Sequence, residues 1–331
     1  DRNITMPLLT GVLNNKKMIK SRSRRKFLAE AGMTTTGILL ANTLTNCSIR
    51  EKSEESAYNL IQEVHSYRKI DAHAHVGLKP GEADEQIDMA DRLGIDKLCI
   101  SMPITNYSGT EPEDPDQVRK NNDQVIKAVK KYPDRYIGFM TLNPVYQKEA
   151  LEEIDRCVDM GMAGYKGYTQ VKINDPLYFP IIEKFIDLNM IMLMHAFVQI
   201  GVGGYRMKYD EGQSAPNTTI PEDMVDIARR YPEGMFQYAH IGGGGDWEYA
   251  CKTFRDYPNI YVDTSGSNNE ENMINFAVDC LGEDRLLFGC DGSHYQGVGK
   301  FFAADLSESQ KKKIFFDNYN NILRKSGNHV A

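Results

Sequence analysis

The sequence predicts a (β/α)8 TIM barrel preceded by an N-terminal export segment. Three observations carry this prediction: after residue 66, short apolar runs alternate with helical patterns, eight such runs occur, and polar residues follow several of them. The main competitor is an open doubly wound sheet, which needs a Gly-rich phosphate loop between its first strand and helix. The sequence has no such loop at that place, so the closed barrel is preferred.

The expected strands are short runs rich in aliphatic and aromatic residues. They cover residues 70–76, 97–102, 136–142, 163–168, 191–197, 236–240, 260–263 and 286–289. Helices are expected between them, at residues 82–93, 117–132, 150–160, 176–188 and 221–231. Several of these stretches end in Gly or Tyr-Pro, which are typical signals for the end of a helix.

The N-terminal segment has the three parts of an export signal. Residues 16–47 contain a cationic stretch, an apolar stretch and a processing point. Residues 23–28, Ser-Arg-Arg-Lys-Phe-Leu, resemble the twin-arginine motif that an export receptor reads. The alternative is an amphipathic helix that is never processed. We expect residues 1–47 to be a twin-arginine-like signal peptide, 48–66 a polar tether and 67–331 the barrel.

A second targeting signal follows at the end of the export segment. Residues 44–47, Leu-Thr-Asn-Cys, look like a bacterial lipoprotein box in which Cys47 is lipidated. Asn46 is bulkier than the small residue usual at its position, so plain cleavage stays open. The sequence therefore predicts a bacterial protein that is exported, and that is either periplasmic or anchored to the membrane through lipidated Cys47.

Charge and cysteine usage narrow the function classes. The net charge is -7 and the cations beyond the N-terminal segment are scattered, which argues against nucleic-acid binding. Six cysteines stand far apart, so most are expected to be buried apolar residues. Cys290, beside a proposed ligand, has an alternative role as ligand or nucleophile. The expected partner is a small-molecule substrate, and a homodimer stays open.

The first expected strand carries an alternating set of polar residues. Because side chains alternate with period two, one set should point inward and the other toward the helices. The inward set is Asp71, His73 and His75, and the outer set is Ile70, Ala72, Ala74 and Val76. Two imidazoles on one rigid strand can bind a single cation. Asp71 either fixes the tautomer of a ligating imidazole or binds backbone amides.

Three further polar residues follow later strands. His195 follows the fifth strand, His240 the sixth and Asp291 the eighth. Each histidine taken singly is more often a core or surface residue than a ligand. In a barrel, however, the C-terminal ends of the strands carry the active site, so these residues would converge on the first strand's histidines. A carboxylate there can bind a metal ion and accept a proton from bound water.

These segments together resemble the amidohydrolase superfamily, and most closely its amidohydrolase-2 branch of decarboxylases, lactonases and hydratases. The matching segments are residues 70–75, 164–167, 193–196, 239–243, 261–265 and 287–291, and residues 320–323 are similar to the family's closing helix. The resemblance implies one divalent metal ion bound by His73, His75, His195 and Asp291. His240 would polarise the substrate or metal-bound water. Zinc is the default ion, and manganese or iron would also fit.

The resemblance also leaves a second metal model open at Lys166. Family members with two metal ions bring a carboxylated lysine from the fourth strand, so a carboxylated Lys166 could hold a second ion. In the one-metal model, Lys166 is a cation for a substrate carboxylate or a structural surface lysine. Three further candidate substrate-binding residues are Tyr168, which lines the pocket or packs in the wall, Arg206 in a Gly-rich loop, and His294 near the rim.

The favoured function is a metal-dependent hydrolase that uses a metal-activated water on a lactone, amide or ester of a small substrate, including an anionic one. Asp291 and His240 would be its catalytic residues. The alternative is a metal-dependent nonoxidative decarboxylase or hydratase, in which Asp291 supplies a proton to carbon. A catalytically inactive exported binding protein is least favoured, because no expected ligand position is replaced.

Overall fold

The computed structural model describes residues 58–103, 113–196, 217–242, 247–266 and 270–331. The expected signal peptide, the lipoprotein box with Cys47, and Arg206 lie outside these residues. The described residues belong to one compact unit, Tyr58–Ala331. Helix α2 (Leu60–His65) lies within the segment expected to be a tether. Among the described helices, none is both long and apolar enough to span a membrane.

Eight parallel strands pair in chain order, which confirms the expected fold class. They are β1 (Ile70–His75), β2 (Lys97–Ser101), β3 (Tyr136–Met140), β4 (Gly164–Gly167), β5 (Ile191–Met194), β6 (Phe236–Tyr238), β7 (Ile260–Asp263) and β8 (Leu286–Leu287). The Ala72 amide donates to the Phe288 carbonyl at 2.8 Å, and the Asp291 amide to the His73 carbonyl at 2.7 Å. These two bonds join β1 to the end of β8 and close the barrel.

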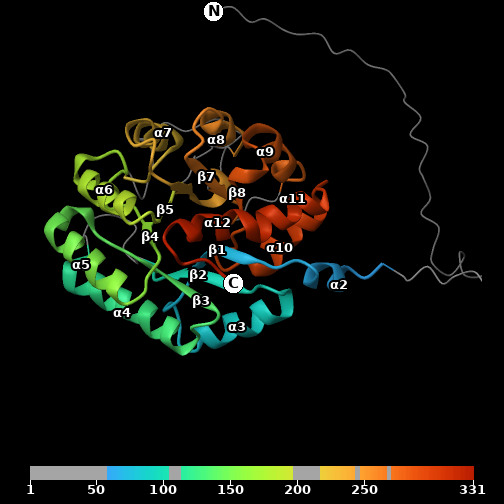
Figure 1. Cartoon of the computed structure of the whole chain (residues 1–331), viewed down its shortest axis with the longest axis horizontal. Helices are drawn as coiled ribbons and strands as arrows, with labels where there is room; N and C mark the ends of the chain where they lie inside the picture. Colours follow the sequence, from blue (N-terminus) through green and yellow to red (C-terminus); the bar gives the residue numbers. More distant parts are fainter. Residues whose placement is uncertain (1–57, 104–112, 197–216, 243–246, 267–269) are drawn as a thin grey trace, which may run out of the picture. The chain divides into compact units, whose positions relative to one another are not determined.

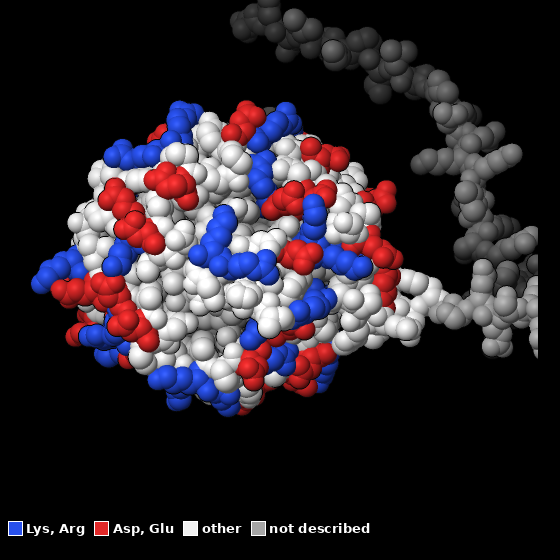
Figure 2. All heavy atoms as spheres, viewed as in Figure 1, with Lys and Arg blue, Asp and Glu red and all other residues white. Residues whose placement is uncertain are grey.

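Helices surround the strands as an outer ring (Figure 1). They are α3 (Glu82–Leu93), α4 (Pro115–Lys131), α5 (Gln147–Asp159), α6 (Phe179–Asp187), α7 (Pro221–Arg230), α8 (Trp247–Phe254), α9 (Met273–Leu281), α10 (His294–Ala303) and α11 (Glu308–Lys312). In contrast, α12 (Asn318–Lys325) supplies residues to the interior of the barrel. The expected helix at 176–188 begins as a separate 3-10 turn, Pro176–Tyr178. Basic and acidic side chains are interspersed on the face in Figure 2.

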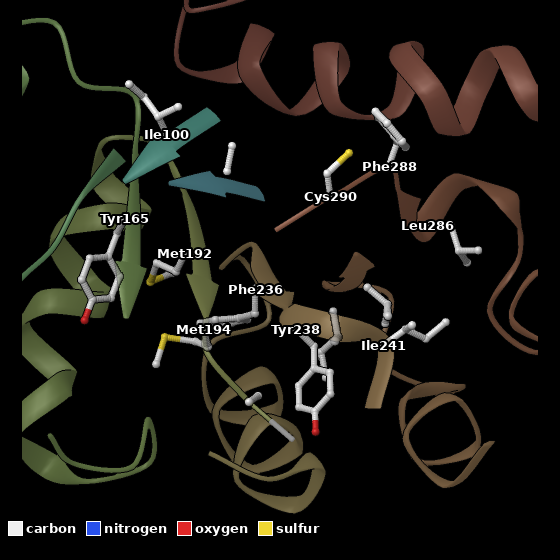
Figure 3. Close-up of a cluster of buried hydrophobic side chains, with 14 of the residues drawn as sticks. Ile100, Tyr165, Met192, Met194, Phe236, Tyr238, Ile241, Leu286, Phe288 and Cys290 are labelled. Atoms are coloured by element: carbon white, nitrogen blue, oxygen red, sulfur yellow. The ribbon is translucent and has the colours of Figure 1, made fainter. Parts of the chain in front are cut away.

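Two apolar clusters lie on opposite sides of the strand wall. One takes residues from strands far apart around the barrel and from α12; among its members are Ile70, Phe139, Leu193, Leu287 and Tyr319. Because opposite strands of a closed barrel meet only through its interior, this cluster fills the barrel. The other cluster lies between strands and helices, and Figure 3 shows Ile100, Met192, Phe236 and Leu286 among its members.

A β-bulge in β1 changes which side chains face the interior. Asp71 pairs with Leu98 and Ala74 with Ile100, so three steps along β1 match two along β2. Ile70 and Ala72 belong to the interior cluster, whereas Ala74 and Val76 belong to the outer one. The prediction of strict alternation was therefore wrong for the start of the strand, because the extra residue of the bulge shifts the pattern by one position.

Candidate metal centre

Polar side chains collect at the C-terminal end of the barrel, where the sequence places them. They are His73 and His75 on β1, Lys166 on β4, His195 after β5, His240 after β6, Asp263 at the end of β7 and Asp291 after β8. Most of the barrel interior below them is apolar. The strands thus bring residues from widely separated parts of the sequence to one end of the fold.

Three of the four predicted ligands come together. His73, His75 and Asp291 each offer a donor atom, and these atoms lie within 4.8 Å of one another. Asp291 Oδ1 lies 2.9 Å from His75 Nε2 and 3.7 Å from His73 Nε2. Donors that share one ion at about 2.1 Å lie roughly 3 to 4 Å apart, and two imidazoles with a carboxylate suit a divalent transition metal. These residues therefore fit one such ion.

His195 lies beside this group and contacts another histidine. Its Nδ1 is 3.1 Å from His240 Nε2, and the two rings meet edge to face with centroids 5.0 Å apart. His195 does not belong to the group formed by His73, His75 and Asp291 among the described residues. The assignment of His195 as a ligand stays a prediction, whereas its position next to the site is a finding.

The backbone is unusual at both predicted catalytic residues. Asp291 has φ 48° and His240 has φ 67°, and both values lie in the left-handed region that non-glycine residues seldom adopt. The Asp291 conformation is held by its amide, which donates to the His73 carbonyl. The His240 amide donates to Asp263 Oδ1 at 3.0 Å. Such strain persists where surrounding bonds enforce it, often at functional sites.

Asp263 orients His73, the first of the histidines predicted to bind a metal ion. Its Oδ2 lies 3.2 Å from His73 Nδ1, and it also accepts a hydrogen bond from Gln237 Nε2 at 2.9 Å. With Nδ1 bonded to a carboxylate, the His73 ring presents Nε2 to a metal ion. Sequence reasoning missed this role, although residues 261–265 were among the matching segments. The sequence did contain a signal for this role. Asp263 is an acidic residue at the C-terminal end of a buried strand, where the active site of a barrel lies.

Asp71 has a different role from Asp263. Its Oδ1 accepts the backbone amides of His73 at 3.0 Å and Cys290 at 2.9 Å. Its Oδ2 has no hydrogen-bond partner among the described residues. Of the two alternatives that the sequence left open, the structure supports the bond to backbone amides. Burial raises the pKa of Asp71 to about 7.

Lys166 is fully buried, so its interpretation as a surface lysine was wrong. Its Nζ lies 2.9 Å from His73 Nε2 and 5.3 Å from the centre of the Tyr168 ring. Burial lowers the pKa of Lys166 to about 8, and the charges of Asp291 and Asp263 oppose that shift. The amino group is therefore held out of solvent, against the candidate metal site.

Burial also sets the charge of the other site residues. It lowers the pKa of His75 to about 4 and that of His240 to about 3, so both rings are neutral at pH 7, as coordination requires. Burial by itself would raise the pKa of Asp291. The neighbouring His73, His75 and His240 outweigh burial and hold that pKa well below its usual range. The neutral rings of His75 and His240 thus lie beside an ionised carboxylate.

The remaining candidate residues lie in different places. Tyr168 is buried and its ring stacks on His195 with centroids 6.0 Å apart. His294 is buried at the start of α10, with Nε2 3.7 Å from Asp71 Oδ2. Cys290 is buried, and burial raises the pKa of its thiol well above the usual value, which disfavours a nucleophile or ligand. Arg206 is outside the described residues.

Comparison with protein families gives one match over most of the barrel. The model described as "Amidohydrolase" matches residues 70–319. The chain is 22% identical over 275 residues to a 2-amino-3-carboxymuconate-6-semialdehyde decarboxylase of Dictyostelium discoideum, covering 74% of both proteins. It is 23% identical over 285 residues to a gamma-resorcylate decarboxylase of Polaromonas sp., covering 73% of this chain and 87% of that protein.

Several solved structures, among them two decarboxylases and a hydratase, have folds similar to that of this chain. A 2,6-dihydroxybenzoate decarboxylase bound to 2,6-dihydroxybenzoate has a TM-score of 0.62 and 20% identity, covering 79% of this chain and all of that one (100%). A dihydroxybenzoic acid decarboxylase from Polaromonas sp. with bound manganese has a TM-score of 0.61 and 20% identity, covering 78% and 97%. A 4-oxalomesaconate hydratase from Rhodopseudomonas palustris has a TM-score of 0.56 and 16% identity, covering 78% and 96%. These likenesses support the barrel fold.

Proposed function

This chain belongs to the amidohydrolase family whose model matches residues 70–319, and we propose that it is a metal-dependent nonoxidative decarboxylase of a small aromatic carboxylic acid. The sequence favoured a metal-dependent hydrolase, and we now prefer its alternative, a nonoxidative decarboxylase. The similar proteins named above are decarboxylases and a hydratase, and two of the similar structures are dihydroxybenzoate decarboxylases.

The observation that carries this proposal is the buried ammonium of Lys166. It lies 2.9 Å from His73 Nε2, at the group that fits a metal ion. Keeping a cation out of water is costly unless a negative charge compensates for it. Asp291 and Asp263 supply part of that compensation. A substrate carboxylate would complete it, whereas a neutral lactone or ester would not.

The stacked rings of Tyr168 and His195 support an aromatic substrate. Their planes are 27° apart, and both lie at the active-site end of the barrel. A planar aromatic acid can stack on such a surface while its carboxylate faces Lys166.

A divalent metal ion would be held by His73, His75 and Asp291, with His195 as the predicted fourth ligand. When bound, it would supply positive charge that stabilises the negatively charged oxygens of the substrate. The chain's own residues would perform the proton transfer. Asp291 Oδ2 lies 3.4 Å from His240 Nδ1, so a proton can be shared between them. That proton would pass to the ring carbon bearing the carboxylate, and the bond to the carboxyl carbon would then break to release CO2.

The test is an assay of metal-loaded protein with two sets of compounds. Hydroxybenzoic acids, beginning with 2,6-dihydroxybenzoate, should release CO2 and yield the corresponding phenol in equal amounts. Aryl esters and lactones should stay intact. Hydrolysis of the second set without CO2 release from the first would overturn the proposal and restore the hydrolase. Manganese and zinc should be compared, since a similar structure contains manganese.

Location in the cell is proposed from the sequence alone. Residues 23–28 support export through a receptor for paired arginines, and residues 44–47 support lipidation of Cys47. Both segments lie outside the described residues. We propose an exported enzyme that acts on aromatic acids outside the cytoplasm.

A further inference from the structure

The hydroxyl of Ser265 lies among three site residues. Its Oγ is 2.5 Å from Asp263 Oδ1, 3.0 Å from His240 Nδ1 and 3.1 Å from His73 Nδ1. The side chain is 1% exposed, so water does not compete for these bonds. Gly266 follows it with φ +85°, and a Cβ there would meet His240 Cβ at 3.1 Å. Ser265 and Gly266 thus approach His240 closely.

The direction of these hydrogen bonds follows from their chemistry. Asp263 Oδ1 accepts the backbone amides of His240 at 3.0 Å and Ser265 at 3.1 Å, and its Oδ2 accepts Gln237 Nε2 at 2.9 Å, so this carboxylate acts as an acceptor. Ser265 therefore donates its single proton to Asp263. What remains on its oxygen are lone pairs, and these can only accept hydrogen bonds from the neighbouring rings.

The tautomer of His240 follows from this direction. Its Nδ1 faces Ser265 Oγ at 3.0 Å and Asp291 Oδ2 at 3.4 Å, and both atoms act as acceptors. Nδ1 must therefore carry the ring proton. A neutral imidazole carries one proton, so Nε2 is then left with a lone pair.

The tautomer of His195 follows in turn. Its Nδ1 lies 3.1 Å from His240 Nε2, which has no proton to donate. His195 Nδ1 must therefore be the donor, and its own Nε2 keeps a lone pair. That nitrogen is the one that remains to bind a metal ion. A chain of directed bonds thus runs from Asp263 through Ser265 and His240 to His195.

We propose that Ser265 is a positioning residue that sets the tautomers of His240 and, through it, of His195. It would keep a proton on His240 Nδ1 beside Asp291, and a lone pair on His195 Nε2. The effect on turnover rests on the proposed decarboxylation, whereas the tautomers do not depend on the reaction. Two independent measurements can therefore be made.

Removal of the Ser265 hydroxyl should let His240 adopt its other tautomer while the protein stays folded. In Ser265→Ala, Asp263 keeps its bonds to the His240 amide, Gln237 and His73. The matched control is Thr264→Val, which removes a neighbouring buried hydroxyl that donates to the Leu287 carbonyl at 3.3 Å and accepts the Gly289 amide at 3.4 Å. Among the described residues this hydroxyl has no hydrogen bond to a histidine. Thermal unfolding should show that both variants fold. If Ser265→Ala does not fold, Ser265→Cys fills the same space with a weaker hydrogen-bonding group.

The first measurement is NMR of zinc-loaded protein labelled with ¹⁵N-histidine, with signals assigned by His240→Asn and His195→Asn. Wild type and Thr264→Val should show a protonated Nδ1 on His240 and on His195. Ser265→Ala, or Ser265→Cys in its place, should show a second tautomer or exchange broadening at His240. Wild-type tautomers at full population in the serine variant would overturn the proposal, as would a protonated Nε2 on His240 in the wild type.

The second measurement is steady-state kinetics on the aromatic acid that the wild type decarboxylates. Ser265→Ala should lower kcat about tenfold, the effect of losing roughly one hydrogen bond, with KM and bound metal nearly unchanged. Thr264→Val should keep the wild-type kcat. A Ser265→Ala enzyme with normal kcat would overturn the role in turnover. Absence of decarboxylation by the wild type would instead overturn the proposed function and leave the NMR result to decide the tautomers.

Discussion

The Asp71 carboxylate accepts the backbone amide of Cys290 at 2.9 Å, across the junction between the first strand and the end of the last. The same oxygen accepts the amide of His73, two residues along its own strand. Cys290 precedes Asp291, so one buried oxygen holds the backbone beside two predicted metal ligands. The bulge in β1 makes this possible, because it turns Asp71 away from the interior cluster that contains Ile70 and Ala72.

We predict that Asp71→Ala weakens both the fold and the metal site, whereas Asp71→Asn is tolerated. Alanine leaves two buried amides without an acceptor, which should cost about 2 to 4 kcal/mol of unfolding free energy. Asparagine keeps an oxygen at the same place. Urea unfolding and metal titration measure the two effects. Equal metal affinity in wild type and Asp71→Ala would show that this bond does not position the ligands.

The apolar pattern of the sequence was sufficient to predict the barrel and all eight strands, since buried parallel strands read as short apolar runs. The strand ends were predicted less well. His195 and His240 lay within expected strands, yet β5 and β6 end before them. At His240 and Asp291 the backbone enters the left-handed region, which no residue-type pattern signals at a non-glycine position.

The candidate site could be predicted only in part, because many contacts between its residues depend on how the strands are arranged. His73 and His75 could be found because they are neighbours in one strand. The contacts of His73 with Asp263 and Ser265 span 190 and 192 residues, so they depend on how β1 and β7 approach across the barrel. The β-bulge in β1 could not be predicted from the sequence either, because it arises from the pairing of β1 with β2 and not from the composition of β1.

Lys166→Met should raise KM for the aromatic acid by about tenfold or more, because it removes a charged hydrogen-bond donor to the substrate carboxylate. Lys69→Met is the matched control. Lys69 is also fully buried, but its Nζ donates to the carbonyls of Val64 and Tyr67, and burial lowers its pKa to about 8 as well. That variant should lose stability and keep KM. An unchanged KM in Lys166→Met would remove the lysine from substrate binding.

Acid should destabilise the metal-free protein through two buried histidines, an effect that Asp71, with its folded-state pKa raised to about 7, offsets only in part. Burial lowers the folded-state pKa of His75 to about 4 and of His240 to about 3, from an ordinary value of 6.5. Between these values the unfolded chain binds more protons than the folded one, so the free energy of unfolding falls as pH falls. Urea unfolding at several pH values below 6.5 measures the slope. His240→Asn should reduce it, and an unchanged slope would contradict the neutral state of this ring.

Export should depend on the paired arginines. Replacing Arg24 and Arg25 by lysine keeps the charge but removes the feature that the receptor reads, so the folded protein should accumulate in the cytoplasm. Cell fractionation measures this outcome, and Cys47→Ser should separately release the protein from the membrane fraction. Normal export of the double-lysine variant would rule out the twin-arginine signal. A wild-type protein already absent from membranes would rule out lipidation.

Asp291→Asn should separate metal binding from proton transfer. The carboxylate lies 2.9 Å from His75 Nε2 and 3.4 Å from His240 Nδ1, and its neighbours keep its pKa well below the usual range. Asparagine keeps one oxygen that can coordinate, but it cannot carry the proton between His240 and the substrate at neutral pH. The variant should therefore retain much of the metal while kcat falls by about 100-fold or more, the usual scale for a lost acid or base. The acid limb of the pH-rate profile should change with it. Near-normal kcat at full metal content would leave Asp291 as a ligand alone and assign the proton transfer to another group.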